Sequence, residues 1–290
     1  IGKAAFPSPL ISTYCATAAL VACNTEAANK ALADIATGTP STLAITNQHG
    51  SWKTSDTDVS CNANKKLSGT AWFVQDAMKC DRFIVSAKQE EGIGLYLVNA
   101  TAAGLTVIPD GIIDLTRDQA HLQFDGVDAI ELSEPGKGDA AIAAATPAIL
   151  TLISADMVGA GEWLLQTTVE YAKTRVQFEH PLGFFQAVKH PLVNVMLDID
   201  RAKSLVYNAA CSIDCNEAGA EMNARMAKSQ ASDMGVFASS RAVQFHGGIG
   251  FTWECYVHLF FKRQMHNQVL FGDGKYQRTL LANMVMGKAA

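Results

Sequence analysis

The sequence predicts an α+β protein of three parts: a short N-terminal helical piece (1–40), a middle antiparallel β domain (41–138) and a C-terminal helical bundle (139–290). Two changes of period predict this order. Helical spacing of apolar residues gives way to short β-branched and aromatic runs near residue 41, and helical spacing returns near residue 138. The composition is 49% hydrophobic and 18% charged, which is globular and sufficient for a sizeable core.

Two helices are expected in the first part, over 11–22 and 25–36, because both segments are rich in Ala and Leu. Asn24 or Thr25 is expected to cap the second helix at its start. A glycine and then a proline, in the stretch 37–40, end it. Two short helices cannot enclose a core, so they must pack on another part of the chain.

Seven short strands, separated by turn-forming clusters, are expected in the middle part. They cover residues 43–46, 66–74, 82–87, 94–99, 105–109, 119–124 and 128–132. Asp125-Gly126 is a hairpin-type turn signal. Short strands at this spacing predict an antiparallel sandwich or barrel.

Five helices joined by short loops are expected in the last part, which predicts an antiparallel bundle. They cover residues 139–174, 183–216, 218–245, 253–269 and 275–286. Asp139 is expected to cap the first of them. Pro191 is expected either to kink the second or to mark a later start.

Charge and cysteine usage exclude several classes of partner and cofactor. The net charge is −5 without a basic stripe, so a nucleic-acid partner is not expected. Seven cysteines without a Cys-x-x-Cys pair predict neither a disulfide framework nor a metal site, and fit a reducing cytoplasm. The apolar run 140–155 is shorter than the roughly 20 residues of a membrane span and is expected to be a core helix. No signal segment opens the sequence, and its first residue, Ile1, is consistent with a missing N-terminal piece.

Two features near the C-terminus carry the functional signal. The string QFHGGIGFT at 244–252 has three glycines within four positions, which would let backbone amides approach a phosphate closely. A plain helix–helix connection explains the same glycines. The string LFGD at 270–273 breaks the pattern before the last helix.

Four strings together resemble the acyl-CoA dehydrogenase family. They are SGTAWFV (68–74) with CDRFIVSA (80–87), RVQFEHPL (175–182) with FQ (185–186), the glycine turn at 244–252, and FGD (271–273). The resemblance runs from about Leu32 to the end of the sequence and implies the family's three-domain fold, here with a short N-terminal domain. It also implies a dimer or tetramer that uses FAD to oxidise an acyl-CoA to the 2-enoyl-CoA. A carboxylate base then removes the α-proton while hydride leaves the β-carbon for the flavin.

The resemblance implies FAD contacts for six residues of the bundle. In the family, the bundle of one subunit completes the FAD site of its neighbour. The matching residues are Arg175 for the pyrophosphate, Phe178 beside it, Gln186 as a polar contact, and Gln244, Gly247 and Gly248 for the diphosphate and adenosine end.

Structural explanations remain open for some of these matches. Arg175 could cap a helix end, and Phe178 could belong to the core. Thr252 and Glu254 match the continuation of the glycine turn, but a helix N-cap followed by an early acidic residue explains them equally well.

The sequence departs from the family in the β domain. The family's flavin loop is Thr-Glu-Pro-Gly-x-Gly-Ser-Asp, whereas TNQHGS at 46–51 keeps only the threonine and shortens the rest. The family's Trp-x-Thr beside the flavin ring is replaced by Phe73-Val-Gln75. The half of the FAD site that a subunit supplies to its own flavin is therefore expected to be eroded.

The catalytic base is also missing from both of its family positions. Phe271 stands where many members carry glutamate, and Ile149 stands where a second subgroup carries it. The family's substrate-binding Asp and Arg fall at Pro147 and Leu150. Loss of a general base costs about 10²–10⁴-fold in rate.

Three hypotheses follow. The first is a subunit of a heterotetramer, α2β2, in which a homologous chain supplies the base. In the family such two-chain enzymes act on bulky acyl-CoA esters such as steroid side chains. The second is a self-sufficient dehydrogenase with Asp273 as a relocated base, although Asp273 could instead cap the final helix. The third is a flavin-free structural homologue.

Overall fold

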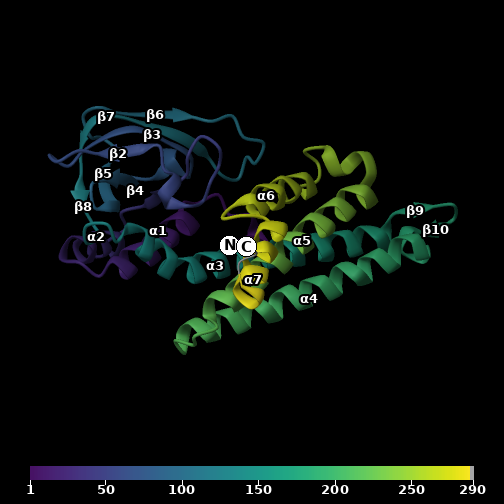
Figure 1. Ribbon diagram of the computed structural model, residues 1–290. Coiled ribbons are helices and arrows are strands. Elements are labelled where there is room, and N and C mark those ends of the chain that lie inside the picture. The colour runs from purple at the N-terminus through teal and green to yellow at the C-terminus, as the bar shows by residue number, and fades with distance from the viewer. Residues whose placement is uncertain (288–290) are drawn as a thin grey trace. The chain divides into compact units, whose positions relative to one another are not determined.

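A computed structural model describes residues 1–287 of the 290-residue chain. The chain divides into two compact units (Figure 1). The sheet unit comprises Pro7–Ile149, and the bundle unit comprises Ile1–Phe6 together with Leu150–Ala290.

The sheet unit begins with two helices, α1 (Leu10–Cys23) and α2 (Glu26–Ala36), close to the predicted ranges. The prediction that Thr25 caps α2 is confirmed. Its hydroxyl oxygen accepts the Ala28 N–H at 3.2 Å and its hydroxyl donates to the Leu132 carbonyl at 2.6 Å. One side chain thus satisfies a free amide of α2 and ties that helix to the chain beyond the last sheet strand.

An eight-stranded sheet forms the rest of the sheet unit, in the order β6-β7-β3-β2-β4-β5-β8 with β1 paired to β4. The strands are β1 (Ser41–Ala44), β2 (Val59–Cys61), β3 (Lys66–Gln75), β4 (Arg82–Gln89), β5 (Gly92–Asn99), β6 (Leu105–Pro109), β7 (Gln119–Asp128) and β8 (Ile130–Glu131). Strands β1 and β2 each pair with β4 in parallel, and all other pairs of neighbouring strands are antiparallel. Short 3₁₀ turns occur at η2 (Thr54–Asp56) and η3 (Ala77–Lys79).

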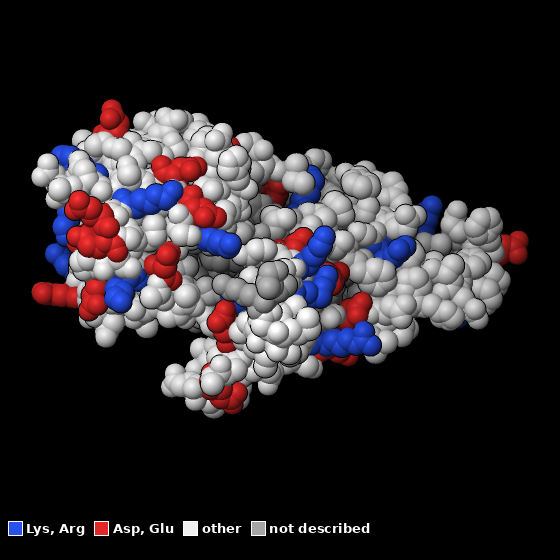
Figure 2. Space-filling model, viewed as in Figure 1, with Lys and Arg blue, Asp and Glu red and all other residues white. Residues whose placement is uncertain are grey.

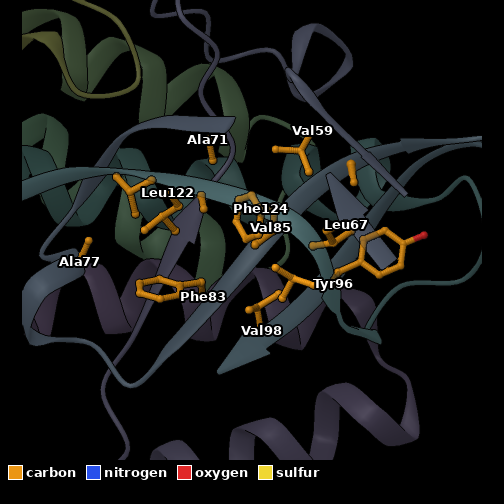
Figure 3. Packing of buried hydrophobic residues seen from close by; sticks show 14 of the residues in the cluster. Val59, Leu67, Ala71, Ala77, Phe83, Val85, Tyr96, Val98, Leu122 and Phe124 are labelled. Carbon is orange, nitrogen blue, oxygen red and sulfur yellow. The ribbon is translucent and has the colours of Figure 1, made fainter. Parts of the chain in front are cut away.

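Side chains from the strands of the sheet form a buried hydrophobic cluster that is the core of this unit. Figure 3 shows Phe83, Val85, Leu122 and Phe124 from β4 and β7 gathered toward one another. Along β7 the buried residues alternate with exposed ones, as a strand with one face on the core requires.

The predicted hairpin turn at Asp125-Gly126 is wrong, because both residues lie inside β7. Leu67 of β3 pairs with Val127 and Ser68 pairs with Asp125, so Gly126 is the extra residue of a β-bulge. Its φ of +63° suits glycine, which explains why the sequence carries a turn signal within a strand.

The bundle unit is built from long helices and a small hairpin. The elements are η1 (Gly2–Ala4), α3 (Gly138–Thr174), whose first residues belong to the sheet unit, β9 (Val176–Gln177), β10 (His180–Pro181), η4 (Leu182–Phe184), α4 (Gln186–Asp214), α5 (Ala220–His246), η5 (Gly247–Phe251), α6 (Val257–Val269) and α7 (Gly274–Met286). The predicted order of a helical piece, a β domain and a helical bundle is confirmed.

Three predicted details of the helices differ from the structure. Asp139 is the second residue of α3 rather than its cap, and it accepts a hydrogen bond from Thr54. Helix α4 starts at Gln186 and contains Pro191. Helix α6 begins at Val257 rather than 253, so Thr252 does not cap it. The Thr252 hydroxyl donates instead to the Ile249 carbonyl at 2.9 Å.

A buried ion pair fixes α6 against α3 inside the bundle unit. Arg263 donates from Nε and Nη2 to the two carboxylate oxygens of Asp156, at 3.0 and 2.9 Å, and Asn267 donates to the same carboxylate at 2.7 Å. The side chains of Arg263 and Asp156 are 1% and 2% exposed. Such pairs need this bidentate geometry to offset the loss of hydration.

Helix α3 is long and apolar enough to cross a membrane by length and composition. Because 56% of its most apolar 18-residue stretch is buried inside the protein, a core helix explains this composition equally well. On the face shown in Figure 2, acidic and basic side chains are interspersed and neither sign forms a continuous area.

Candidate functional site

The β9–β10 hairpin presents two of the predicted site residues. Arg175 follows the last residue of α3, where its N–H donates to the Tyr171 carbonyl and its carbonyl accepts from the Leu182 N–H, both at 2.9 Å. The two turn residues, Phe178 and Glu179, have φ values of +52° and +65°. Two-residue hairpin turns of this kind favour Asn-Gly, and left-handed backbone costs other residues about 1–2 kcal/mol each.

The strained turn holds an aromatic ring out in solvent. Phe178 is 85% exposed, so the alternative that it belongs to the core is wrong. Phe185 meets its ring edge-on at a centroid distance of 6.2 Å, while His180 stacks on Phe184 at 4.1 Å. Gln186 is exposed and follows this aromatic group as the first residue of α4.

Arg175 itself has no acidic partner among residues 1–287. The residue is exposed, and it stands at the junction of α3 and the hairpin. A free guanidinium at such a junction can donate two parallel hydrogen bonds to a phosphate.

The three glycines of the turn at 244–252 are not all needed for the same structural reason. Gly247 has a φ of +65° after the last residue of α5, a conformation that favours glycine. At Gly250 a Cβ would lie 3.1 Å from the Cβ of His246, so packing explains that glycine. Neither backbone conformation nor packing requires a glycine at Gly248, because a Cβ there would meet nothing within 4 Å. The missing side chain at Gly248 leaves open space on the outside of the turn.

A stacked aromatic pair brings the hairpin side and the glycine-turn side together. The Tyr171 ring lies on the His246 ring at 4.4 Å, and its hydroxyl donates to the His246 carbonyl at 3.5 Å. Burial lowers the pKa of His246 below its ordinary value, which favours a neutral ring in this stack. Arg175 lies one helical turn after Tyr171, and Gly247 directly follows His246. The exposed Gln244 lies in the last turn of α5.

All six predicted cofactor residues therefore belong to the end of the bundle unit where α3 and α5 terminate. Sequence reasoning missed the exposed aromatic residues beside them. Phe184, Phe251, Trp253 and Tyr256 are 57–67% exposed. Exposed large aromatic side chains of this kind are candidates for contact with a ligand or partner. In the sequence, Phe251, Trp253 and Tyr256 cluster directly after the glycines, and this clustering could have identified them.

The expected base position contains no carboxylate. Phe271 has a φ of +54°, and its half-buried ring packs on a cluster that includes Leu150, Ala209 and Ala224. The side chain of Gln277 donates to the Phe271 carbonyl at 2.6 Å. The second family position, Ile149, is fully buried.

Asp273 acts as the N-cap of α7. Its Oδ1 accepts the Tyr276 N–H at 2.8 Å, which confirms the capping interpretation of this residue. A carboxylate engaged in this way is already oriented toward the start of its own helix.

In the sheet unit, the segment that replaces the family's Trp-x-Thr contains a β-bulge. The register of β3 against β7 shifts between Ala71 and Val74, which leaves an extra residue in β3, and Phe73 stands there at a φ of +54°. The amide of Gln75 donates to the Phe73 carbonyl at 3.0 Å and to the Gln119 side chain at 2.8 Å. The residue that replaces the family's threonine is thus engaged within the sheet.

Residues 151–286 match the family "Acyl-CoA dehydrogenase, C-terminal domain". Among solved structures, a variant of the Tcur3481-Tcur3483 steroid ACAD is 26% identical with a TM-score of 0.88, covering 98% of this chain and 78% of that one. Butyryl-CoA dehydrogenase from Megasphaera elsdenii is 26% identical with a TM-score of 0.87, covering 96% and 76%. Residues 151–286 thus match the C-terminal domain of acyl-CoA dehydrogenases, and the fold of the chain is that of acyl-CoA dehydrogenases.

Two curated relatives carry the same name. Acyl-CoA dehydrogenase IpdE2 of Mycobacterium tuberculosis is 39% identical over 155 residues, which are 53% of this chain and 44% of the relative. The IpdE2 of Mycolicibacterium smegmatis is 31% identical over 172 residues, 59% and 50% of the two chains. The matched segments thus span about half the length of these relatives.

Proposed function

We propose that this chain is one subunit of an FAD-dependent acyl-CoA dehydrogenase that desaturates an acyl-CoA thioester between its α- and β-carbons. In this proposal the chain contributes the cross-subunit half of an FAD site, and a homologous partner chain supplies the catalytic base. The assembly would be a cytoplasmic α2β2 heterotetramer.

One contrast carries the proposal. The end of the bundle unit that would face a neighbour's FAD keeps Arg175, Phe178 and an open glycine turn, whereas the base position holds Phe271. A chain that had lost the activity altogether would have no evident reason to keep a strained, exposed aromatic turn.

The residues present fit a dinucleotide on three grounds. The unpaired Arg175 guanidinium would bind the diphosphate, and the space over Gly248 would let the turn's backbone approach it. The exposed Phe178 ring offers an apolar face for the cofactor. FAD, when bound, supplies the acceptor for the hydride that leaves the β-carbon.

The self-sufficient alternative requires Asp273 as the base. Its carboxylate would have to leave the Tyr276 amide, uncapping α7 at a cost of about 1 kcal/mol, before it could take a proton. The geometry therefore favours the partner-supplied base.

The names of the relatives suggest the substrate class. A structural neighbour is a steroid ACAD, and the curated relatives are acyl-CoA dehydrogenases. We propose a bulky, steroid-type CoA ester as the substrate.

Co-expression tests the proposal. The chain is purified alone and together with the product of the neighbouring gene, and bound flavin is read from the visible absorbance spectrum. We expect flavin and acyl-CoA dehydrogenase activity only in the co-purified complex. In that complex Arg175→Ala should release FAD, while Arg201→Ala, an exposed arginine on α4, serves as the matched control. A yellow, active homo-oligomer would contradict the proposal, and a colourless complex would favour the flavin-free homologue.

A further inference from the structure

Lys228 is a buried lysine without a carboxylate in hydrogen-bond contact. It lies on α5 and is fully inaccessible to solvent. Its ammonium donates to the Ser232 hydroxyl at 2.8 Å, to the Gln268 carbonyl at 2.8 Å and to the Gly272 carbonyl at 2.9 Å. A lysine ammonium has three N–H donors, so these three acceptors use them all.

The two carbonyls lie on either side of the base position. Gln268 belongs to the last turn of α6, where carbonyls lack partners within the helix, and Gly272 precedes α7. A cation at a helix C-terminus also interacts favourably with the helix dipole. Lys228 therefore joins the end of α6 to Gly272, two residues before α7, with Phe271 between the two anchored carbonyls in the sequence.

The anchored segment has a backbone that its own sequence does not favour. Phe271 has a φ of +54° and Gly272 a φ of +92°, and a Cβ at Gly272 would overlap the Tyr276 ring. Such backbone persists only where the surroundings fix it. Besides Lys228, the fixing contacts include the Gly272 N–H to the Val269 carbonyl at 3.0 Å and the Gln277 amide to the Phe271 carbonyl.

We propose that Lys228 is a positioning residue that holds the backbone of residues 268–272 and thereby keeps the Phe271 ring against the cluster around Leu150 and Ala209. The base position is then occupied by a fixed apolar wall rather than by a mobile loop. The positioning of the Phe271 ring does not depend on the proposed function. Only the role of this wall in an acyl-CoA site rests on that proposal.

The charges around Lys228 are consistent with an anchor rather than an ion pair. Asp233 on α5 and Asp273 before α7 are the carboxylates whose fields act on it. Asp233 is paired with Arg278 at 2.6 Å, and Asp273 caps α7. Burial lowers the pKa of Lys228 to about 7, and the neutral amine keeps two N–H donors, which are enough for the Gln268 and Gly272 carbonyls.

Two measurements on the full chain test the proposal without flavin, substrate or a partner chain. Hydrogen exchange followed by mass spectrometry reports the amides of residues 269–276. A 4-fluorophenylalanine at position 271 reports the ring through its ¹⁹F resonance. The variant is Lys228→Met, which keeps an unbranched side chain one atom shorter and without a donor. The matched control is Lys275→Met, at an exposed lysine of α7.

We expect the segment to exchange at least tenfold faster in Lys228→Met, with strands β4 and β5 unchanged. The single ¹⁹F resonance of the wild type should broaden or split in this variant and stay unchanged in Lys275→Met. An unchanged resonance and unchanged local exchange in a folded Lys228→Met protein would overturn the proposal.

If Lys228→Met does not fold, the wild type and Lys228→Gln decide. In the wild type the amide of Gly272 should be protected like those of α5, and exchange at the rate of a free loop would overturn the proposal. Lys228→Gln, whose amide can donate but reaches less far, should show intermediate exchange. Because neither readout needs FAD, a failure here is distinct from a failure of the proposed function.

Discussion

The pH dependence of stability gives a quantitative test of the environment of Lys228. Its pKa falls from an ordinary 10.5 to about 7 because burial removes hydration from the ammonium. Between these two values the unfolded chain holds a proton that the folded chain has released. Since stability rises with pH wherever the unfolded state binds more protons, this lysine should stabilise the fold progressively from about pH 7 toward pH 10.

The expected magnitude follows from the slope of this linkage. One site contributes at most about 1.4 kcal/mol per pH unit, so the free energy of unfolding should rise by about 2–3 kcal/mol between pH 7.5 and 9.5. Other groups titrate in this range, so the meaningful quantity is the difference between the wild type and Lys228→Met. Urea unfolding monitored by circular dichroism at 222 nm reports mainly the helices of the bundle unit.

The control is Lys275→Met, whose difference from the wild type should stay flat across the same range because this lysine is exposed. A wild-type minus Lys228→Met difference that is flat, or that falls with rising pH, would refute the reasoning. It would mean that the ammonium remains charged in the folded protein, stabilised by its carbonyl partners beyond the cost of burial.

Three further predictions concern single side chains. Asp156→Ala should lower the free energy of unfolding by about 3–5 kcal/mol because it removes the carboxylate that binds a buried guanidinium. Asp233→Ala at an exposed pair should cost less than about 1 kcal/mol, and urea titration separates the two variants. Gly250→Ala should lower the melting temperature, while Gly248→Ala should leave it unchanged and weaken FAD retention in the complex; equal melting temperatures would contradict the packing argument. Phe178→Gly should not destabilise the chain, because it removes an exposed side chain from a left-handed position, yet should weaken flavin retention; a loss of thermal stability would show that the ring supports the fold.

Periodicity was sufficient to predict the long elements but not their pairing. The helices of the bundle appear within a few residues of their predicted ranges because their apolar stripes are long. Strand β2 (Val59–Cys61) was missed since three residues in a polar stretch carry no period. The parallel pairing of β1 with β4 joins Ser41 to Arg82, and no local pattern encodes a contact across that separation.

The candidate site could likewise be predicted from the sequence only in part. The resemblance identified Arg175, Phe178 and the glycine turn from short strings, and the structure adds that Tyr171 stacked on His246 connects them. The role of Lys228 had no signal in the sequence. In a helical pattern a lysine is expected on the solvated face, and only the position of α6 and α7 against α5 places two carbonyls at its ammonium.

Two aromatic residues of the bundle unit share an unfavourable backbone conformation, and their surroundings differ. Phe271 is held at a φ of +54° by Gln277 at its own carbonyl, by Lys228 at the next and by an apolar cluster under its ring. Phe178 is held at +52° by little more than a two-residue turn, with its ring 85% exposed.

Strain that the chain itself supports can be explained by a role within the subunit, here an apolar wall at the base position. The hairpin turn costs about 1–2 kcal/mol in the same way but has no apolar cluster under its ring, so the proposed cofactor contact would give this conformation a function. The distribution of strain therefore points in the same direction as the missing carboxylate. The base position is closed by Phe271, whereas the hairpin leaves the Phe178 ring exposed, which is the arrangement that the proposed cross-subunit role requires.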